Sequence, residues 1–323
     1  MMPTGLKCAA WGAILALAVL PSAHADGIIG SGRGIDHMGI AVRDLGAATR
    51  DFNALGFAVR PGGRFPGGLS NALAYLDDGF YLEILGVAAQ HSKDNNDIAD
   101  FAKKHEGAMF LGINVGSAKA AVELLRSRKF DATGPDPGSI MTGNQTKPPP
   151  PMWYDVYTQD KPAKGKRTFT LPIFFIQYVN EHWMDKYRAK GITNQPNTAT
   201  AVRGVWFEVN DLQAKLAELH EGGFDRPSRN VSLLLPAPSG KAIPAGRGTI
   251  NIVVPIKTGE PASPPVEERI VAISIAVKDL GKARAMARAA TKRDLPVYNG
   301  TYGKSILIPP ETVHGVSIEL VQQ

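Results

Sequence analysis

Hydrophobic and polar residues alternate over the stretch IDHMGIAV at positions 35–42, which is the pattern of a β-strand. Apolar residues then recur at helical spacing from Leu45 to Leu55, with Asp44 placed to cap this helix and Gly56 to end it. The same patterns predict a short strand at residues 57–59 and two further strands, at residues 72–76 and 80–87, joined by a turn at 77–79. This part of the chain therefore predicts a β-α-β-β-β unit.

The same order of elements recurs three more times, beginning near Ala108, Arg203 and Arg269. Three of the four copies place Asp-Leu between the first strand and an amphipathic helix, at 44–45, 211–212 and 279–280. One βαβββ unit leaves a face of its small curved sheet exposed, so two units must pair to bury it. We therefore predict an α+β fold of four βαβββ modules in two paired domains, at residues 26–180 and 203–323. The alternative is chance similarity among the segments of an unrepeated α+β protein.

Residues 181–202 are polar and include Pro196 and Asn197, which predicts a linker between the two domains.

The first 25 residues have the pattern of a signal peptide. Lys7 supplies the positive charge, residues 9–20 the apolar segment, and Ala23-His24-Ala25 a cleavage site with small residues. We expect a bacterial, Sec-type signal and hence a periplasmic or secreted protein, with no membrane contact after cleavage. Cleavage after Ala25 also removes Cys8, the one cysteine of the chain, so disulfides and thiol catalysis are excluded for the mature protein.

The chain is basic, but its basic residues are dispersed. The net charge is +6, or +5 once Lys7 is removed, and the sequence pI is about 9.3. Lysine and arginine gather only at residues 164–167, and no basic helix with interleaved aromatic residues occurs. We therefore expect a small-molecule ligand and no nucleic acid as partner. The sequence gives no indication of the oligomeric state.

Several motifs of the first module occur together in one known superfamily. They are IDHMGIAV at 35–42 with Asp44 and Leu45 after it, Leu-Gly-Phe at 55–57, Pro-Gly-Gly-Arg at 61–64, Asn-Ala at 71–72 and Tyr-Leu-Glu at 81–83. This combination resembles the vicinal oxygen chelate superfamily in its glyoxalase-like branch, closely over residues 33–90 and more loosely beyond. The resemblance implies paired βαβββ modules, the glyoxalase/extradiol-dioxygenase-like domain, forming a cup around a divalent metal.

Carried over by position, His37 and Glu83 would be metal ligands from the first module. Aligning the second copy places Phe110 opposite His37 and Gln177 opposite Glu83, so the predicted ligands are His37, Glu83 and Gln177. One imidazole with oxygen donors suits Zn, Mn, Fe or Ni without distinguishing them. His182 is a reserve ligand. Glu83 is also the predicted catalytic base. The ordinary alternatives are that His37 is a hydrogen-bonded histidine of the core and that Gln177 is an amide that satisfies a strand end.

Four residues are predicted to contact the substrate: Arg64, Phe65, Asn71 and Phe110. Arg64 and Asn71 would meet an anionic or carbonyl group, unless they serve loop packing and turn formation instead. Phe65 occupies a position where many relatives have histidine, and Phe110 removes a second polar group from the cup.

The second domain is predicted to be degenerate. Gly204 and Ala272 occupy its two histidine positions, and Glu319 alone remains at a ligand position. One ligand does not hold a metal, so this half is expected to be a structural or pocket-shaping partner.

Two functions follow from these patterns. The first is an exported, metal-dependent lyase, isomerase or dioxygenase acting on a small oxygenated substrate. The second is a metal-free protein that binds and sequesters a small molecule in the same cup, which Phe65 and Phe110 favour. A third possibility is an interaction module with a filled cup.

Overall fold

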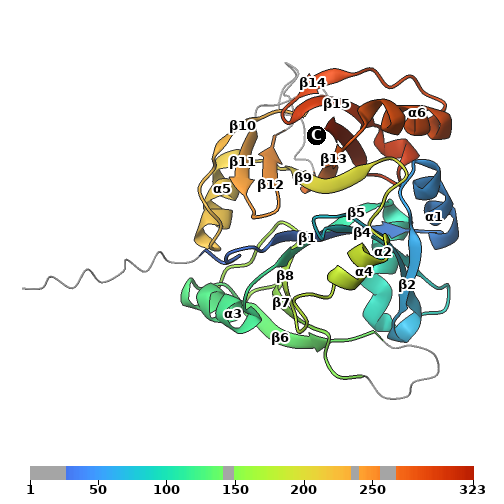
Figure 1. Cartoon of the computed structure of the whole chain (residues 1–323). Coiled ribbons are helices and arrows are strands. Elements are labelled where there is room, and N and C mark those ends of the chain that lie inside the picture. Colours follow the sequence, from blue (N-terminus) through green and yellow to red (C-terminus); the bar gives the residue numbers. More distant parts are fainter. Residues whose placement is uncertain (1–26, 141–148, 234–239, 255–266) are drawn as a thin grey trace, which may run out of the picture.

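The structure is a computed structural model, and it describes residues 27–140, 149–233, 240–254 and 267–323. The predicted signal peptide, residues 1–25, lies outside the described residues. Within the described parts, the chain forms two eight-stranded sheets, one from each half of the sequence. Figure 1 shows the two curled sheets one above the other, with the helices around them. Among the described residues, no helix is both long and apolar enough to span a membrane.

The first sheet has the strand order β2-β3-β4-β1-β5-β8-β7-β6. Its first module consists of β1 (Gly34–Val42), α1 (Leu45–Ala54), β2 (Arg60–Arg64), β3 (Leu69–Tyr75) and β4 (Tyr81–Val87). Helix α2 (Asn96–Lys104) leads to the second module, which consists of β5 (Gly107–Asn114), α3 (Ala118–Ser127), β6 (Ala132–Gly138), β7 (Trp153–Thr158) and β8 (Ile173–Tyr178). The two modules join where β1 pairs antiparallel with β5.

The second sheet repeats this arrangement in the order β10-β11-β12-β9-β13-β16-β15-β14. Its modules consist of β9 (Ala199–Glu208), α5 (Leu212–Glu221), β10 (Arg229–Val231), β11 (Gly240–Pro244) and β12 (Thr249–Val253), then β13 (Arg269–Val277), α6 (Leu280–Thr291), β14 (Tyr298–Gly300), β15 (Gly303–Ile308) and β16 (Ser317–Gln322). The prediction of four βαβββ modules in two paired domains is confirmed.

The three helices that follow the Asp-Leu pairs begin where the sequence predicts. The side chains of Asp44, Asp211 and Asp279 each accept a hydrogen bond from the backbone N–H three residues later, and Ser117 does the same for α3. Such caps satisfy N–H groups that have no partner inside the helix. The repeated Asp-Leu dipeptide is therefore a repeated helix start.

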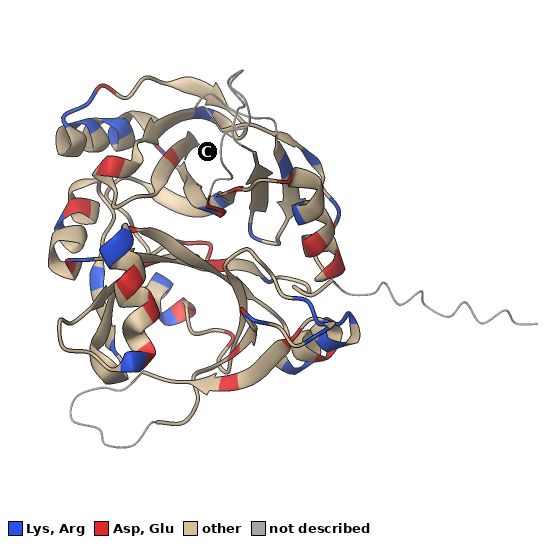
Figure 2. Ribbon diagram, turned by 180° about the vertical axis from the view of Figure 1, so that it is seen from behind, with Lys and Arg blue, Asp and Glu red and all other residues tan. Residues whose placement is uncertain are grey.

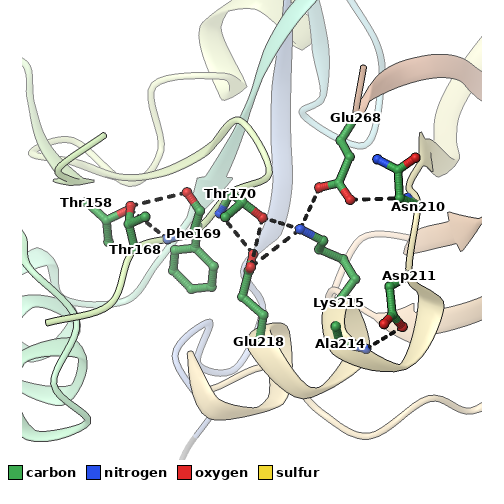
Figure 3. Close-up of polar contacts among 10 residues, drawn as sticks. All are labelled: Thr158, Thr168, Phe169, Thr170, Asn210, Asp211, Ala214, Lys215, Glu218 and Glu268. Atoms are coloured by element: carbon green, nitrogen blue, oxygen red, sulfur yellow. Dashed lines mark hydrogen bonds and ion pairs between the residues drawn. The ribbon is translucent and has the colours of Figure 1, made fainter. Parts of the chain in front are cut away.

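The two domains share one hydrophobic core. Buried residues from both sheets form a single cluster, in which β5 contacts β13 and α1 contacts α6. At the edge of this core, Lys215 of α5 is almost fully buried. Figure 3 shows its contacts with Thr170, Glu218 and Glu268. Its Nζ atom is 2.6 Å from Glu268 and 3.5 Å from Glu218, and it donates to Thr170 of the first domain. This ion network fixes α5 against both domains.

The predicted linker is packed against the first domain. It contains the short helix α4 (Asp185–Ala189), and β9 begins within it at Ala199. The buried side chain of Gln195 accepts a hydrogen bond from Ala58 N at 2.6 Å and donates one to Tyr75 O at 2.7 Å. The connection therefore has a fixed place beside the first sheet.

Candidate functional site

The concave face of the first sheet encloses a cavity of about 420 Å³, which is within the usual size of small-molecule sites. Five of the residues predicted from the sequence line it: His37, Phe65, Asn71, Glu83 and Phe110. They come from both modules, so the pairing of the modules creates the site.

A β-bulge places the polar group at the floor of this cavity. Ile35 pairs with Ile113 and His37 with Gly112, so Asp36 is an extra residue in β1. Asp36 and His37 are both buried, and His37 Nδ1 lies 2.8 Å from Asp36 Oδ1. The carboxylate therefore accepts from Nδ1–H and directs Nε2 toward Glu83.

The charge of Asp36 changes the proton affinity of His37. Burial opposes a charged imidazole, but the hydrogen bond and charge of Asp36, with the charges of Glu83 and Asp155, outweigh burial and raise the pKa of His37 above its ordinary value. Tyr178 also donates to Asp36, at 2.7 Å. The floor is thus a hydrogen-bonded network of ionisable groups.

Glu83 is held by Asn71. Asn71 Nδ2 donates to Glu83 Oε1 at 2.6 Å, and Asn71 Oδ1 accepts from Gly63 N at 2.6 Å. The other carboxylate oxygen, Glu83 Oε2, is 3.6 Å from His37 Nε2. The imidazole and the carboxylate predicted from the sequence therefore converge inside the cup. The amide group of Asn71 is engaged with Glu83 and Gly63, where we had expected it to meet a carbonyl substrate.

Strand register identifies the two positions equivalent to these in the second module. Gly39 pairs with Phe110 as Gly112 pairs with His37, so Phe110 is the equivalent of His37. Glu83 pairs with Gly39, and Phe174 pairs with Gly112, so Phe174 is the equivalent of Glu83. Both rings contact the imidazole of His37, with centroids 5.9 Å and 5.4 Å away. Two phenyl rings thus occupy the positions where further metal ligands would be needed.

Gln177 and Arg64 do not join the site. Gln177 lies on the face of β8 opposite the cavity-lining residues Phe174, Ile176 and Tyr178, and its Oε1 accepts from Ala118 N at 2.9 Å. The alignment that chose it was three residues out of register, an odd number that changes the face of a strand. Arg64 is exposed and is absent from the cavity lining. We correct both expectations. The reserve ligand His182 is likewise absent from the cavity lining and lies 3.3 Å from Asp185.

The donor set does not fit the divalent metal that the fold typically binds. A catalytic metal usually has three protein ligands. Here His37 and Glu83 converge alone, and no group of three or more His, Cys, Asp or Glu side chains able to hold an ion occurs in the described parts of the chain. The side chains present thus favour a site that works without a bound ion.

The sequence analysis missed Asp155, a carboxylate on β7 that lines the same cavity. Its Oδ2 accepts from Trp153 Nε1 at 2.8 Å, whereas its Oδ1 is buried and has no hydrogen-bond partner in the described structure. Burial raises the pKa of Asp155 to about 6, against the lowering effects of Trp153 and of the charge on His37. In the sequence, the alternation of polar and apolar residues in WYDVYT, at positions 153–158, was the only pattern that could have placed Asp155 on a strand.

Aromatic side chains form the walls. Tyr81 stacks on His37 with centroids 4.6 Å apart and planes at 9°. Trp183, just before α4, and Tyr187, within α4, both contact Tyr75, with ring centroids 6.0 Å and 4.9 Å away. The segment expected to be only a linker therefore supplies one wall of the cavity. Figure 1 shows α4, in this segment, lying beside the first sheet.

The cup of the second domain is filled by its own side chains. Glu319 is 1% exposed and accepts hydrogen bonds from Ser274 and from Tyr298, the latter at 2.9 Å. Trp206 is fully buried and donates to Ser274 at 2.7 Å. These contacts are those of a structural partner.

A larger cleft of about 980 Å³ lies between the domains. Its most notable polar residue, His314, is held between Glu106 at 2.9 Å and Asp51 at 3.1 Å, which makes it a domain contact. The first cup has the convergent, partly unsatisfied polar groups expected of a binding site, and we assign the site there.

Comparison with known proteins agrees with this geometry. The model of the glyoxalase-like domain family matches residues 35–223, and the chain belongs to this family. No curated protein matches the sequence. Similar solved structures share the fold at low sequence identity.

Three of these structures cover most of the chain. A hypothetical protein from Staphylococcus aureus has a TM-score of 0.58 at 14% identity, covering 90% of this chain and 98% of its own. A mutant of 4-hydroxymandelate synthase from Streptomyces coelicolor has 0.55 at 11%, covering 90% and 92%. A fusion of a xylose isomerase-like TIM barrel with 4-hydroxyphenylpyruvate dioxygenase has 0.53 at 11%, covering 94% of this chain and 51% of its own.

Proposed function

We propose that this protein binds a small, largely aromatic molecule in the cup of its first domain, without a metal. The observation that carries the proposal is the pair of rings, Phe110 and Phe174, at the two positions equivalent to His37 and Glu83. They leave two donors where a catalytic metal needs three, and they make the cavity suitable for a planar apolar group.

The polar floor gives the pocket the means to move a proton. His37 Nε2 and Glu83 Oε2 both face the cavity, and Asp36 supports a charged imidazole. A ligand hydrogen placed between them would be within reach of Glu83 as the base, with a charged His37 on the other side as the acid. Metal-independent proton transfer is the reaction that this arrangement can perform.

Native mass spectrometry of the full mature protein tests the binding function. We expect a co-purifying organic molecule, or binding of an added aromatic probe such as 2-phenylethanol that persists in EDTA. Ile176→Trp would fill the cavity with an indole ring and should abolish this binding. Retention of the probe by Ile176→Trp would contradict the assignment of the site.

The second candidate is a metal-dependent enzyme of the vicinal oxygen chelate type. The 3.6 Å separation of His37 Nε2 and Glu83 Oε2 favours it, since two ligands of one ion lie at about such a distance. The position of Asp36 on Nδ1 is also what a metal-bound histidine usually has. Stoichiometric Zn, Mn, Fe or Ni in protein purified without chelator, lost in His37→Ala, would establish this candidate over the first.

Export is part of the proposal. The charged, apolar and small-residue segments of positions 1–25 support secretion through a Sec-type signal. N-terminal sequencing of protein from a periplasmic fraction should begin at Asp26. An intact N-terminus on protein found with the cytoplasmic fraction would contradict it.

A further inference from the structure

The charges around the cavity of the first domain are out of balance. Three carboxylates, Asp36, Glu83 and Asp155, are at or directly behind the cavity wall, whereas His37 is the one ionisable base at its described floor. His37 already contacts Asp36 at 2.8 Å, and Arg247 Nη1 of the second domain lies 4.0 Å from the other oxygen of Asp36. The exposed Lys186 lines the rim, with its Nζ 5.2 Å from the ring centroid of Tyr187. Asp36 therefore has two basic partners, and the excess of negative charge in the cavity lies on Glu83 and Asp155.

Two of these carboxylates have an oxygen left for a ligand. Asn71 engages Oε1 of Glu83 and Trp153 engages Oδ2 of Asp155. Glu83 Oε2 has only the 3.6 Å approach of His37. Asp155 Oδ1 is buried without a partner of hydrogen-bond geometry among the described residues, and the Tyr157 hydroxyl is the wall group that faces this carboxylate. A carboxylate oxygen that is buried without a partner is strongly stabilised by a positively charged hydrogen-bond donor.

The walls fit the same chemistry. Tyr75, Tyr81, Trp183 and Tyr187 form a connected cluster of rings on one side, with neighbouring centroids 4.9–6.0 Å apart. Aromatic cages attract cations through the negative faces of the rings, most strongly when water is excluded. The position of Lys186 over Tyr187 shows that a cation already uses one of these rings at the rim.

We propose that the ligand of this pocket is an organic cation, an amine or ammonium group attached to an aromatic or short apolar body. Its charge lies between Glu83 and Asp155 and its apolar body against the ring cluster. This assignment rests on the proposed binding function and names its ligand class. The expectation of an anionic or carbonyl substrate is replaced, because Arg64 is outside the cavity and Asn71 is engaged with Glu83.

Calorimetric titration of the full mature protein with three probes of similar shape tests the inference. The probes are 2-phenylethylamine, 2-phenylethanol and 3-phenylpropanoate, which are cationic, neutral and anionic, each measured with and without EDTA. We expect the amine to bind at least about tenfold more tightly than the alcohol, and the acid not to bind, because one charge–carboxylate contact in a desolvated site is worth roughly that factor. EDTA should change neither affinity.

Variants separate the charge from the shape of the site. Asp155→Asn should weaken the amine about tenfold and leave the alcohol unchanged, since it preserves the size of the side chain and removes its charge. Tyr187→Leu at the wall should also weaken the amine more than the alcohol. Asp160→Asn, which removes an exposed carboxylate from the loop after β7, is the matched control and should change neither.

Each outcome decides between the proposals. Equal affinity of the amine and the alcohol, or preference for the acid, would overturn the cationic ligand and leave the binding function intact. Binding of the acid that EDTA abolishes would overturn it in favour of a metal ion as the positive group. Failure of all three probes, in the wild type and in Tyr187→Leu alike, would overturn both proposals together.

Discussion

At the scale of single residues, the floor of the cup depends on two glycines that face two rings. A Cβ atom on Gly39 would lie 2.2 Å from the ring of Phe110, and one on Gly112 would lie 2.5 Å from the ring of His37. These close approaches are what let one ring from each module reach the same cavity. The sequence motif at residues 35–42 contains Gly39, but only the strand register shows which ring each of the two glycines accommodates.

Gly39→Ala tests this close packing. The added methyl group has to displace Phe110, which should destabilise the fold by about 1–3 kcal/mol and push the ring into the cavity. Gly116→Ala is the matched control, because a Cβ there meets nothing within 4 Å. Chemical denaturation of both variants measures the difference, and equal stability of the two would contradict the described packing.

Asp155 predicts a specific dependence of stability on pH. Its pKa in the folded protein is about 6, above the ordinary value of 3.8. A raised carboxyl pKa stabilises the fold below the unfolded value, and this contribution is lost as pH rises through 6. The groups that face the Asp155 carboxyl are the same in the wild type and in the Asp155→Asn variant: Trp153, Tyr157, His37 and Glu83. Asp155→Asn should therefore gain stability relative to the wild type between pH 4 and 7, by up to about 3 kcal/mol.

Urea denaturation of both proteins at several pH values checks this. A difference in stability that stays constant from pH 4 to pH 7 would show that the carboxyl is ordinary and solvated.

At the scale of elements, alternation and capping residues placed the first strand and helix of the chain, whereas register was not available from the sequence. Residues 35–42 were predicted as a strand and form most of β1 (Gly34–Val42), but the strand predicted at residues 57–59 was wrong, since β2 begins at Arg60. Gln177, by contrast, was placed in the right strand but on the wrong face, since a sequence pattern of period two does not say which residues of β8 pair with β5. Asp155 was missed because its strand, β7, was not predicted.

The ion network around Lys215 joins elements of both domains and carries an element-scale prediction. Lys215→Met keeps the apolar stem but leaves Glu218 and Glu268 without their buried partner. We expect a loss of about 1–3 kcal/mol in stability, because two partly buried carboxylates then lack their counter-charge. Lys119→Met, at an exposed pair with Glu123, should change stability by less than about 0.5 kcal/mol.

Thermal denaturation of the two lysine variants measures this contrast. A Lys215→Met protein as stable as the Lys119→Met protein would mean that the network is no more than a surface contact.

At the scale of the whole molecule, duplication explains both the similarity and the difference of the two halves. The repeated pattern predicted the paired modules, and the family match and the two matching sheets confirm them. What the pattern did not show is that the second cup is filled by Trp206 and its neighbours, or that the connecting segment closes the first cup. Those contacts join residues that are distant in the sequence. Figure 2 shows acidic and basic residues interspersed over the ribbon, in line with the dispersed charge of the sequence.

Metal removal is the whole-molecule prediction. Dialysis against EDTA should leave the thermal midpoint within about 1 °C, since a ligand stabilises a fold only if it binds the folded state. A fall of several degrees that Zn, Mn, Fe or Ni reverses would support the metal-dependent candidate.

The most direct test of the central claim is a crystal structure of the mature protein purified without chelator, with anomalous data collected at the metal edges. The account predicts electron density for an organic molecule between the floor of His37, Glu83 and Asp155 and the aromatic wall, with no anomalous peak at the floor. An anomalous peak bound by His37 Nε2 and Glu83 Oε2, with further protein or water ligands completing its coordination, would contradict it.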